Sequence, residues 1–424
     1  MNQVQREPGG GGPARLAIPI VGVIMLALLA DGLDLQLLSL VAPVILEEWS
    51  VSRAAFGPAL SAALLGVALG TSIGGWMGDR FGRKQVLLWA VVWFGAATIA
   101  ASYTHDVTQL TVLRLLGGLG FGAAAPNGTA LANEWVPLVW RPRVTSMLTM
   151  GTPLGGMLGA LLVPQVLPHV GWRGSFIYCG AVSLALAVLV FLVVRESPDF
   201  RARAAGREPG AEPAGLSGVF APQFKRLNWG AWICYFCLSV VAYAIAAWSP
   251  VFFTSAGLSL EQALGAVIVF NLCAVVAAIS AGFIVTRIGS RLLIGVCCAI
   301  LLAAIAMLYV ALVRLPPGTL AGMVLARVAM GAIGATTGTT LAMMVAILAL
   351  AYPTAIRSTG LGIGGMVGRC GGIVIALFGG AILSFNGTDP TALFVVLGIA
   401  TIIAFGAMLV IDRHIPPRGG VARP

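Results

Sequence analysis

Charge is what this sequence of 424 residues lacks most, because Asp, Glu, Lys and Arg together make up only 9% of it. An ordinary globular protein carries about 25%. A soluble fold of this size covers its outside with charged side chains, and forty of them (25 + 15) are too few. Hydrophobic residues make up 59%, which also excludes a disordered chain. The composition therefore predicts a membrane protein.

Groups that carry enzyme chemistry are equally scarce. The three histidines are dispersed near the ends of apolar runs or in the C-terminal tail, and all seven cysteines lie within apolar runs. Cys234-x-x-Cys237 has no partner pair, so buried small side chains are the simpler interpretation. We find no metal cluster, nucleophile–base pair or phosphate-binding loop. The sequence therefore predicts neither an enzyme nor a metal or cofactor site.

Apolar runs long enough to cross a bilayer, about 20 residues each, recur along the whole chain. They lack the alternation of barrel strands, and lipid offers no partner to unpaired backbone groups, so each is predicted to be a helix. The fold class is thus an all-α membrane protein with twelve transmembrane helices. The predicted spans are 16–41, 56–78, 86–104, 109–132, 144–168, 174–195, 229–253, 262–286, 291–313, 319–348, 357–384 and 391–411.

Polar segments divide the chain into five parts. Residues 1–15 are expected to form a disordered cytoplasmic tail, and residues 412–424 a second cytoplasmic tail. Residues 196–228 contain scattered Pro, Gly and charge, a composition typical of a flexible connector. This cytoplasmic loop separates two six-helix bundles, 16–195 and 229–411.

The two halves of the chain repeat one another. Gly75-Trp-Met-Gly-Asp-Arg-Phe-Gly-Arg-Lys84 follows the second span, and Gly282-Phe-Ile-Val-Thr-Arg-Ile-Gly-Ser-Arg291 follows the eighth with the same spacing. Arg114 and Arg327 open similar glycine-rich segments 213 positions apart (327 − 114). A duplicated six-helix unit explains both matches, and such internal repeats are typical of secondary transporters.

The net charge of +10 would suggest a nucleic-acid partner in a soluble protein, but the positions of the charges explain it otherwise. With a cytoplasmic N-terminus, the cytoplasmic segments hold 19 of the 25 Lys and Arg, and the outside loops hold three. Positive charge is retained on the cytoplasmic side of membrane proteins. We therefore expect both termini in the cytoplasm, the lipid bilayer as the surrounding partner, and no nucleic acid.

Five charged residues fall inside predicted spans, away from their first and last positions: Asp31, Asp34, Arg114, Arg327 and Arg369. Charges at such depth are costly and usually functional. The two aspartates are three residues apart and share one helical face. The cluster is suited to a central cavity in which protonatable acids lie beside cations that hold an anion. Structural pairing between helices is the simpler alternative, as is snorkelling for the two shallower arginines in spans 4 and 10.

Glycine recurs every four residues in three spans, a spacing that lets helices pack closely. Sliding contacts and static packing explain these glycines equally well. The series are Gly66, Gly70, Gly74 and Gly78, then Gly151, Gly155 and Gly159, and finally Gly360, Gly364, Gly368 and Gly372.

Residues 75–84 resemble the loop that marks the major facilitator superfamily. Within it, the chain resembles the aromatic acid:proton symporter family through Asp31-Gly-Leu-Asp34, Arg114-x-x-x-Gly-Leu-Gly, and Tyr352–Gly360 with Gly368-Arg369. Gly-Leu-Asp-Leu-Gln after Asp31 is most similar to hydroxyphenylpropionate transporters. Further matches make the resemblance nearly as long as the chain: Pro126-Asn127, Gly171-Trp172-Arg173, Glu196-Ser-Pro198 and Trp248-x-Pro250.

The resemblance implies two pseudo-symmetric bundles and proton-driven uptake of small aromatic carboxylates, of the benzoate, hydroxybenzoate, protocatechuate or hydroxyphenylpropionate type. It implies no cofactor beyond the proton gradient. Asp31 and Asp34 would couple protons, while Arg114 and Arg369, with Arg327 as a further candidate, would attract the carboxylate. Tyr243 and Trp248 are candidate ring neighbours, with a core or interface-belt role as the equal alternative. The residues expected to gate the inner side are Gly75, Asp79, Arg80, Gly82, Arg83, Lys84 and Glu134.

Two departures from the family pattern alter these expectations. Thr286 stands where the second-half motif usually has Asp, so any inner gate depends on the first-half loop. Ala376-Leu377 replaces the usual Gly-Pro, which predicts a less kinked helix.

Two other functions stay open at the level of sequence. Gly151-Thr-Pro-Leu-Gly-Gly156 faintly resembles exporters, so a proton-coupled antiporter that exports drugs or metabolites is the main alternative. A non-transporting sensor would bind ligand without flux. We expect a multi-pass monomer in the bacterial cytoplasmic membrane.

Overall fold

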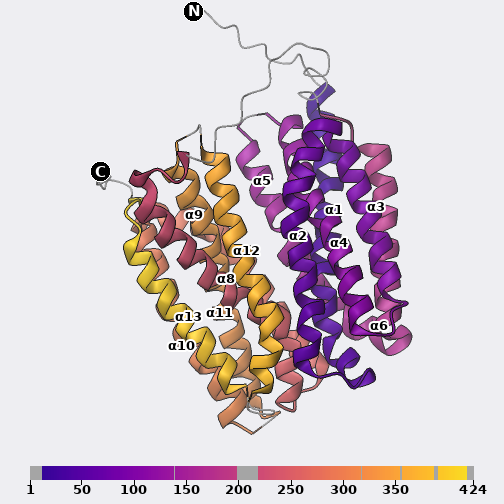
Figure 1. Cartoon of the computed structure of the whole chain (residues 1–424), viewed down its shortest axis with the longest axis vertical. Helices are drawn as coiled ribbons and strands as arrows, with labels where there is room; N and C mark the ends of the chain where they lie inside the picture. The colour runs from indigo at the N-terminus through magenta and orange to yellow at the C-terminus, as the bar shows by residue number, and fades with distance from the viewer. Residues whose placement is uncertain are drawn as a thin grey trace, which may run out of the picture.

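The computed structural model describes residues 12–137, 139–197, 218–316, 318–353, 356–385 and 390–417. Figure 1 shows long, roughly parallel helices packed side by side. The elements are α1 (Gly12–Glu48), α2 (Arg53–Phe81), α3 (Arg83–Ala101), α4 (Val107–Trp135), α5 (Arg141–Thr149), α6 (Gly151–Val193), η2 (Pro222–Phe224), α8 (Lys225–Ser255), α9 (Leu260–Ile288), α10 (Ser290–Tyr309), η3 (Val310–Arg314), α11 (Leu320–Ala351), α12 (Arg357–Ser384) and α13 (Thr391–Val410).

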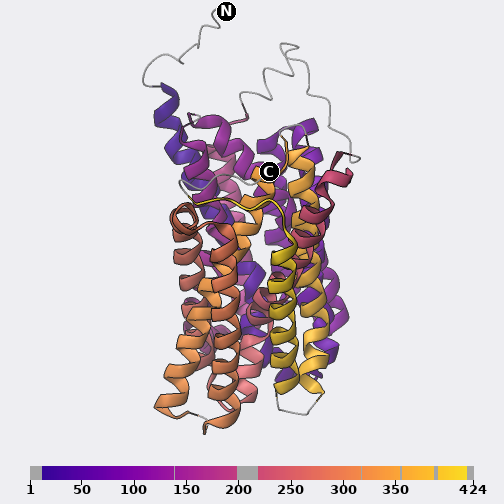
Figure 2. The same cartoon turned by 90° about the vertical axis from the view of Figure 1, so that its left-hand side faces the viewer.

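The two ends of the bundle differ in which turns they carry. The start of α1, the α2–α3 turn and the last residue of α13 lie at one end, here called the terminal end (Figure 1). The α1–α2 and α8–α9 turns lie at the opposite end, here called the far end. Figure 2, turned by 90°, shows the helices of the second half running between the same two ends.

Eleven helices in the described part of the chain are long and apolar enough to cross a membrane, so the protein is a multi-pass membrane protein. The sequence predicts twelve spans. The difference lies in α6, whose 43 residues cover most of both the fifth and the sixth predicted span. Gly171 interrupts it with φ 66° and ψ −177°, a conformation that glycine adopts without steric cost. The 43 residues of α6 correspond to about 65 Å of helix, which is about twice the length that one membrane crossing needs.

The sequence repeat has a structural counterpart. Gly82 ends α2 with φ 102°, and Gly289 ends α9 with φ 79°, at the same position of the two matched segments. Both glycines allow the chain to reverse in a single residue between two long helices. In each half the helix before this turn packs against the second helix after it, α2 against α4 and α9 against α11.

The glycine series of α2 meets α4 in a regular register. A Cβ at Gly66, Gly70 or Gly74 would overlap the backbone of α4 at Leu115, Leu119 or Ala123 respectively. Each step of four residues on α2 thus matches a step of four on α4. The predicted close packing of these helices is confirmed, and it buries the glycine edge of α2.

Several boundaries differ from the predicted domain limits. Helix α1 begins at Gly12, inside the segment expected as a tail, and α8 begins at Lys225, inside the expected connector. Residues 1–11 and 198–217, and the last residues from 418 to 424, lie outside the described part. Residues 411–417 run along the C-terminal half, where Ile415 and Ser290 exchange two hydrogen bonds of 2.9 Å.

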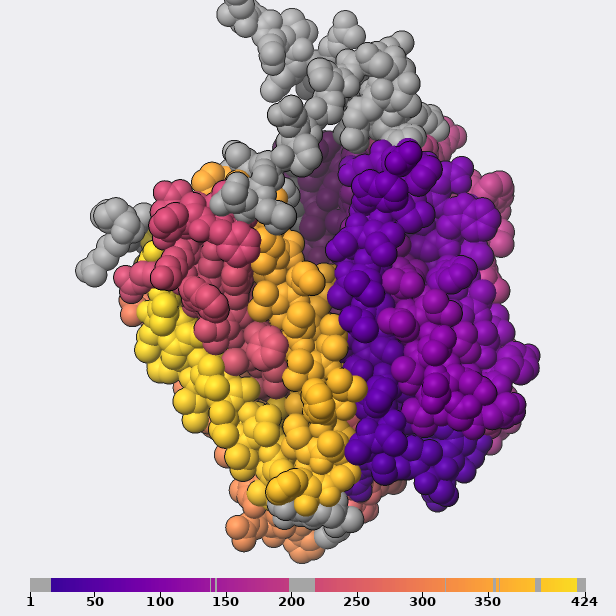
Figure 3. All heavy atoms as spheres, viewed as in Figure 1, coloured from indigo at the N-terminus to yellow at the C-terminus, as the bar shows by residue number. Residues whose placement is uncertain are grey.

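The two halves contact each other closely at the far end. A Cβ at Gly57 of α2 would overlap the backbone carbonyl of Leu377 in α12, and one at Gly380 would overlap the backbone of Arg53. Figure 3 shows α2 and α12 in contact over this region, with a recess between the halves near the terminal end. The glycines therefore bring the two backbones together where α2 starts and α12 ends.

Candidate functional site

A buried ion pair lies in the core of the first half. Arg114 of α4 approaches the Asp34 carboxylate of α1 at 3.3 Å, and the two side chains are only 3% and 1% exposed. Thr98 of α3 donates a hydrogen bond of 2.9 Å to the same carboxylate. The Cys179 thiol of α6 lies 3.8 Å from it. The structure thus brings together two predicted site residues, and four helices of one half enclose them.

Asp31 lies one helical turn before this pair but has different surroundings. Its side chain is 5% exposed, and its Oδ1 atom is buried without a hydrogen-bond partner. A buried carboxylate oxygen without a partner is costly when charged, because neither water nor protein compensates it. Asp31 is therefore the acid of the first half whose charge is least compensated by its neighbours.

Arg114 was predicted to attract the substrate carboxylate. In this conformation its guanidinium is paired with Asp34 and lies 4.9 Å from the centre of the Phe176 ring. Its Nε atom is buried without a partner. Arg114 therefore holds the four helices of its own half together here, and direct substrate binding by this residue stays a prediction.

Arg369 occupies the middle of α12 in the second half. In the described part of the chain no ion pair or hydrogen bond joins its half-buried guanidinium to the protein. Tyr235 and Tyr243 of α8 lie against Gly368 and Gly372 of the same helix, where a Cβ would overlap the rings. The glycine spacing of α12 thus makes room for two phenol rings beside an unpaired cation.

Tyr235 is a functional candidate that the sequence analysis missed. It lies eight residues before Tyr243, close to two full turns, so both rings lie on the same face of α8. Both are within electrostatic range of Arg369. That spacing, together with the glycines four apart on α12, was the available signal.

Two other predicted binding residues lie elsewhere. Arg327 is exposed on α11, with a terminal nitrogen near Gly265 of α9. The Trp248 indole is fully buried and donates a hydrogen bond of 3.3 Å to the Ile375 carbonyl. The structure therefore does not bring Arg327 to Arg369, and Trp248 fills the contact between α8 and α12.

The predicted gating loop has its described ionic contacts within the first half. Arg83 pairs with Glu134 of α4 and lies 3.4 Å from Asp79. Glu134 also accepts a hydrogen bond from the Ser197 hydroxyl. Through Arg83 and Glu134 the turn after α2 is joined to the end of α4.

The remaining loop residues extend this network to α6. Lys84 donates from its backbone to Glu196 at 3.1 Å and from Nζ to the Phe191 carbonyl at 2.9 Å. The Arg80 guanidinium lies over the Trp76 ring at 5.5 Å, on an exposed surface. Gly75 has open space beside it, and Gly82 makes the turn.

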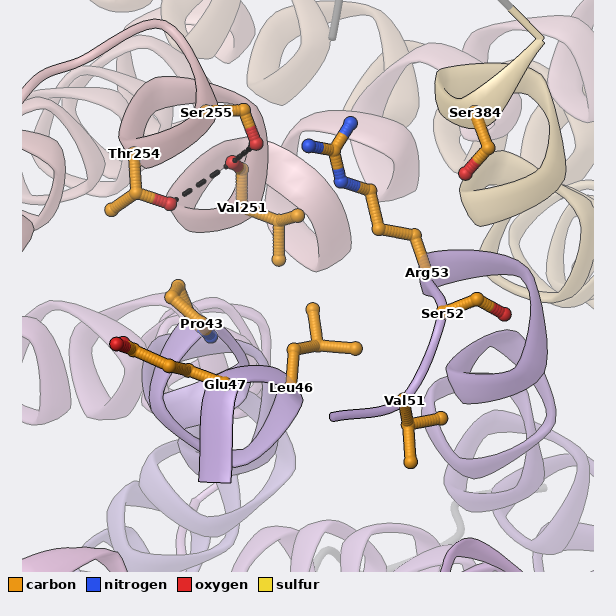
Figure 4. Close-up of a pocket in the computed structure, with 10 residues that line it drawn as sticks. All are labelled: Pro43, Leu46, Glu47, Val51, Ser52, Arg53, Val251, Thr254, Ser255 and Ser384. Carbon is orange, nitrogen blue, oxygen red and sulfur yellow. Dashed lines mark hydrogen bonds between the residues drawn. The ribbon is translucent and has the colours of Figure 1, made fainter. Parts of the chain in front are cut away.

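A cavity of about 410 Å³ opens at the far end between the two halves. Its wall combines the ends of α1, α2, α8 and α12, and Figure 4 shows the Arg53 side chain extending between Ser255 and Ser384. Glu47 contributes a carboxylate on the other side. All these residues lie at helix ends, so this cavity is separate from Asp31 and Arg369 in the middle of their helices.

Comparison with known proteins agrees with this geometry. Residues 24–342 match the family described as Major Facilitator Superfamily. A gallate transporter of Pseudomonas putida is 33% identical over 421 residues, covering 92% of this chain and 90% of the relative. A 4-hydroxybenzoate transporter of the same species is 31% identical, covering 90% of each chain.

The fold agrees as well. The crystal structure of a D-xylose-proton symporter aligns with a TM-score of 0.74 at 18% identity, covering 96% of this chain and 99% of that one. The predicted resemblance to aromatic acid transporters is confirmed by the sequence matches, and the all-helical fold by the structural one. This chain belongs to the major facilitator superfamily, a superfamily of transporters rather than enzymes.

Proposed function

We propose that this protein is a proton-coupled symporter that imports small aromatic carboxylates across the bacterial cytoplasmic membrane. The observation that carries the proposal is Arg369: a cation in the middle of a membrane helix, without a counter-charge in the described residues and within electrostatic range of two tyrosine rings. A guanidinium binds a carboxylate through charge-assisted hydrogen bonds. Two phenol rings nearby suit the flat ring of the substrate.

The relatives support this choice of substrate. The two that match over about nine-tenths of the chain carry the names of gallate and 4-hydroxybenzoate transporters. Both names denote benzoate-type acids with ring hydroxyls. We therefore propose benzoates and hydroxybenzoates as the first substrates to test.

Proton coupling is proposed for Asp31, with Asp34 as the second acid. Asp34 already has Arg114 and Thr98 as partners, whereas the Oδ1 atom of Asp31 has none. A buried acid without a partner suits a group that gains a proton before the loaded protein changes conformation, because the neutral form is cheaper to bury. The proton gradient then replaces any cofactor.

We propose twelve crossings, with both termini in the cytoplasm and a single chain as the working unit. The break at Gly171 divides α6 into two segments of about 20 residues, each sufficient for one crossing. Under this orientation the terminal end is cytoplasmic. The far end, where Gly57 and Gly380 bring α2 and α12 together, is then closed to the outside.

The exporter-like segment of the sequence has a packing explanation. A Cβ at Gly151 would crowd Leu28 of α1, and one at Gly155 would overlap the backbone at Leu29. These glycines let α6 lie against α1, so their spacing needs no export function. We therefore favour import over antiport.

Uptake into proteoliposomes tests the proposal directly. Radiolabelled benzoate, 4-hydroxybenzoate and protocatechuate should accumulate under an inward proton gradient and stop accumulating when a protonophore is added. Asp31→Asn should abolish gradient-driven accumulation but leave counterflow exchange. Accumulation by Asp31→Asn equal to the wild type would refute the proton role, and efflux driven by the same gradient would favour the antiporter.

The role of Arg369 needs a separate pair of variants. Arg369→Gln should raise KM for every aromatic acid by at least tenfold, because the substrate loses its counter-charge. Arg369→Lys keeps the charge but lacks the bidentate geometry, so its effect should be intermediate. Arg327→Gln, which removes an exposed guanidinium away from Arg369, serves as the matched control and should leave KM unchanged.

A further inference from the structure

Two carboxamides join the halves of the molecule in the middle of the bundle. Gln36 of α1 donates from Nε2 to Oδ1 of Asn271 in α9 at 3.3 Å, and Asn271 donates from Nδ2 to Oε1 of Gln36 at 3.2 Å. Gln36 is half-buried and Asn271 is 2% exposed. The two residues are 235 positions apart, and they lie in different halves of the repeat.

The surrounding backbone keeps space for this pair. A Cβ at Gly156 of α6 would overlap the carboxamide of Gln36. Gly156 is itself buried, so a larger residue there would displace the Gln36 side chain. The position of the carboxamide therefore depends on a glycine from a third helix.

The pair lies at the depth of the proposed transport residues. At 1.5 Å per residue, Gln36 is about 3 Å further along α1 than Asp34 and about 8 Å further than Asp31. Asn271 is eleven residues from the start of α9, about 16 Å from the far end. Since the hydrocarbon core is about 30 Å thick, both amides lie near its middle.

The two carboxamides can form more hydrogen bonds than the two that join them to each other. Each side chain has two N–H donors and a carbonyl with two lone pairs, and the mutual pair occupies one donor and one acceptor on each. Neutral hydrogen bonds of this kind contribute only about 1 kcal/mol each. The two amides can therefore separate readily if a new partner takes their place.

We propose that Gln36 and Asn271 are the specificity-determining residues that recognise a ring hydroxyl of the substrate. This rests on the proposed function. The amides bond to each other in the conformation closed at the far end. When the halves part, a phenolic hydroxyl, which is both donor and acceptor, bonds to them while Arg369 holds the carboxylate. Buried amides left without that hydroxyl discriminate against an unhydroxylated acid.

The test compares benzoate with 4-hydroxybenzoate, 3-hydroxybenzoate and protocatechuate in proteoliposomes. Wild-type protein should prefer at least one hydroxylated acid over benzoate in kcat/KM by about tenfold. Gln36→Leu and Asn271→Leu should abolish that preference by raising KM for the hydroxylated acid, with KM for benzoate changed less than twofold. Gln109→Leu, which removes an exposed carboxamide on α4, should keep the wild-type preference.

Two further variants separate recognition from folding. Gly156→Ala should reproduce the loss of preference without removing a polar group, because it displaces Gln36. The exchange variant Gln36→Asn with Asn271→Gln keeps both amides and should retain at least part of the preference. A thermal melt on each variant identifies any that fail to fold.

Each other result counts against the proposal. A parallel loss for benzoate and hydroxylated acids would assign the amides a structural or gating role only. A wild type without preference for a ring hydroxyl, or leucine variants with the wild-type preference, would overturn it. Failure of the wild type to transport any aromatic acid would instead overturn the proposed function itself.

Discussion

Asp31 and Asp34 are three residues apart on one helix, yet their surroundings separate their roles. Asp34 is enclosed by Arg114, Thr98 and the thiol of Cys179. Asp31 has a buried oxygen without a partner. Structural pairing, considered for both from sequence, describes Asp34 in this conformation and leaves Asp31 open for proton transfer.

The buried pair predicts a stability effect at Asp34. Asp34→Asn should destabilise the first half by about 3–5 kcal/mol, because it leaves the Arg114 charge buried without compensation. Thermal unfolding of the purified variants in detergent would measure this.

Two controls define the outcome. Asp31→Asn, with no pair to break, should melt close to the wild type. A double variant, Asp34→Leu with Arg114→Met, should recover much of the loss. Equal melting of Asp34→Asn and Asp31→Asn would contradict the structural role of the pair.

At the scale of the helix, the contact between α2 and α12 depends on two glycines, which have no side chain to keep the backbones apart. Gly57 faces the Leu377 carbonyl, and Gly380 faces the backbone of Arg53. Because backbone atoms have no rotamer with which to move aside, any side chain at Gly57 keeps the two helices apart. Closure of the far end therefore depends on two residues.

Gly57→Trp should hold the far end open and slow transport at least tenfold, while substrate still binds from outside. The measurement is labelling of a single cysteine placed at Ser61, which lies one turn after Gly57 on the same face of α2 and is only 6% exposed. The variant is free of other cysteines, and the reagent is a membrane-impermeant maleimide. Labelling should rise with Gly57→Trp. Gly22→Trp on α1, where a Cβ meets nothing within 4 Å, should leave labelling and uptake unchanged, and unchanged labelling in Gly57→Trp would exclude closure through this contact.

The segment 411–417 predicts a pH dependence. His414 lies 3.2 Å from the Ser290 hydroxyl and 3.3 Å from the Met408 carbonyl. Burial lowers its pKa, nearby Arg291 acts in the same direction, and Asp412 and backbone hydrogen bonds oppose it. When residues 411–417 leave the surface around Ser290, His414 therefore binds a proton more readily than when they are packed, or docked, against it. The contribution of His414 to docking is complete above its ordinary pKa of 6.5. It is lost as the pH falls toward the lowered pKa of the docked His414.

Hydrogen exchange of residues 411–417 at pH 7.5 and 5.5, corrected for intrinsic rates, measures this dependence. Protection should decrease at pH 5.5 in the wild type and become independent of pH in His414→Gln. Ser290→Ala should lower protection at both values, because it removes the hydroxyl that accepts from the Ile415 backbone. Greater protection at pH 5.5 than at pH 7.5 would contradict the lowered pKa of His414.

At the scale of the whole molecule, charge and contacts divide between the two ends. The network of Arg83, Glu134 and Lys84 lies at the terminal end and links helices of the first half alone. Among the described residues, backbone contacts between the halves lie at the far end, and hydrogen bonds between them lie at Gln36. The twelve crossings that we propose would put both termini on one side, and the distribution of basic residues predicts that this side is the cytoplasm.

Reporter fusions test this topology. A fluorescent protein fused after Pro424 should fluoresce, and alkaline phosphatase at the same place should be inactive. Alkaline phosphatase fused after Gly171 should be active, because that turn faces the periplasm if α6 crosses twice. Inactive phosphatase at Gly171 would mean that α6 does not reach the outer side there.

Much of this architecture could be predicted from the sequence, because a helix that crosses lipid must be apolar over its whole length. Apolar length located the helices, and glycine spacing predicted that the second span packs closely against a neighbour, which the structure identifies as α4. The gap predicted between the fifth and sixth spans, 169–173, contains Gly171, where the backbone of α6 leaves the helical conformation. Tyr235 and the Gln36–Asn271 contact were missed because rotation of each helix about its axis decides which polar side chains meet.

The four-residue register between α2 and α4 has a mechanical consequence. Gly66, Gly70 and Gly74 each fit against one backbone position of α4. A shift of one, two or three residues would bring side chains against those backbone positions, so only steps of about 6 Å restore the fit. The packing therefore disfavours gradual sliding between these helices. We expect the first half to move as one rigid body, by rotation about its contacts with the second half.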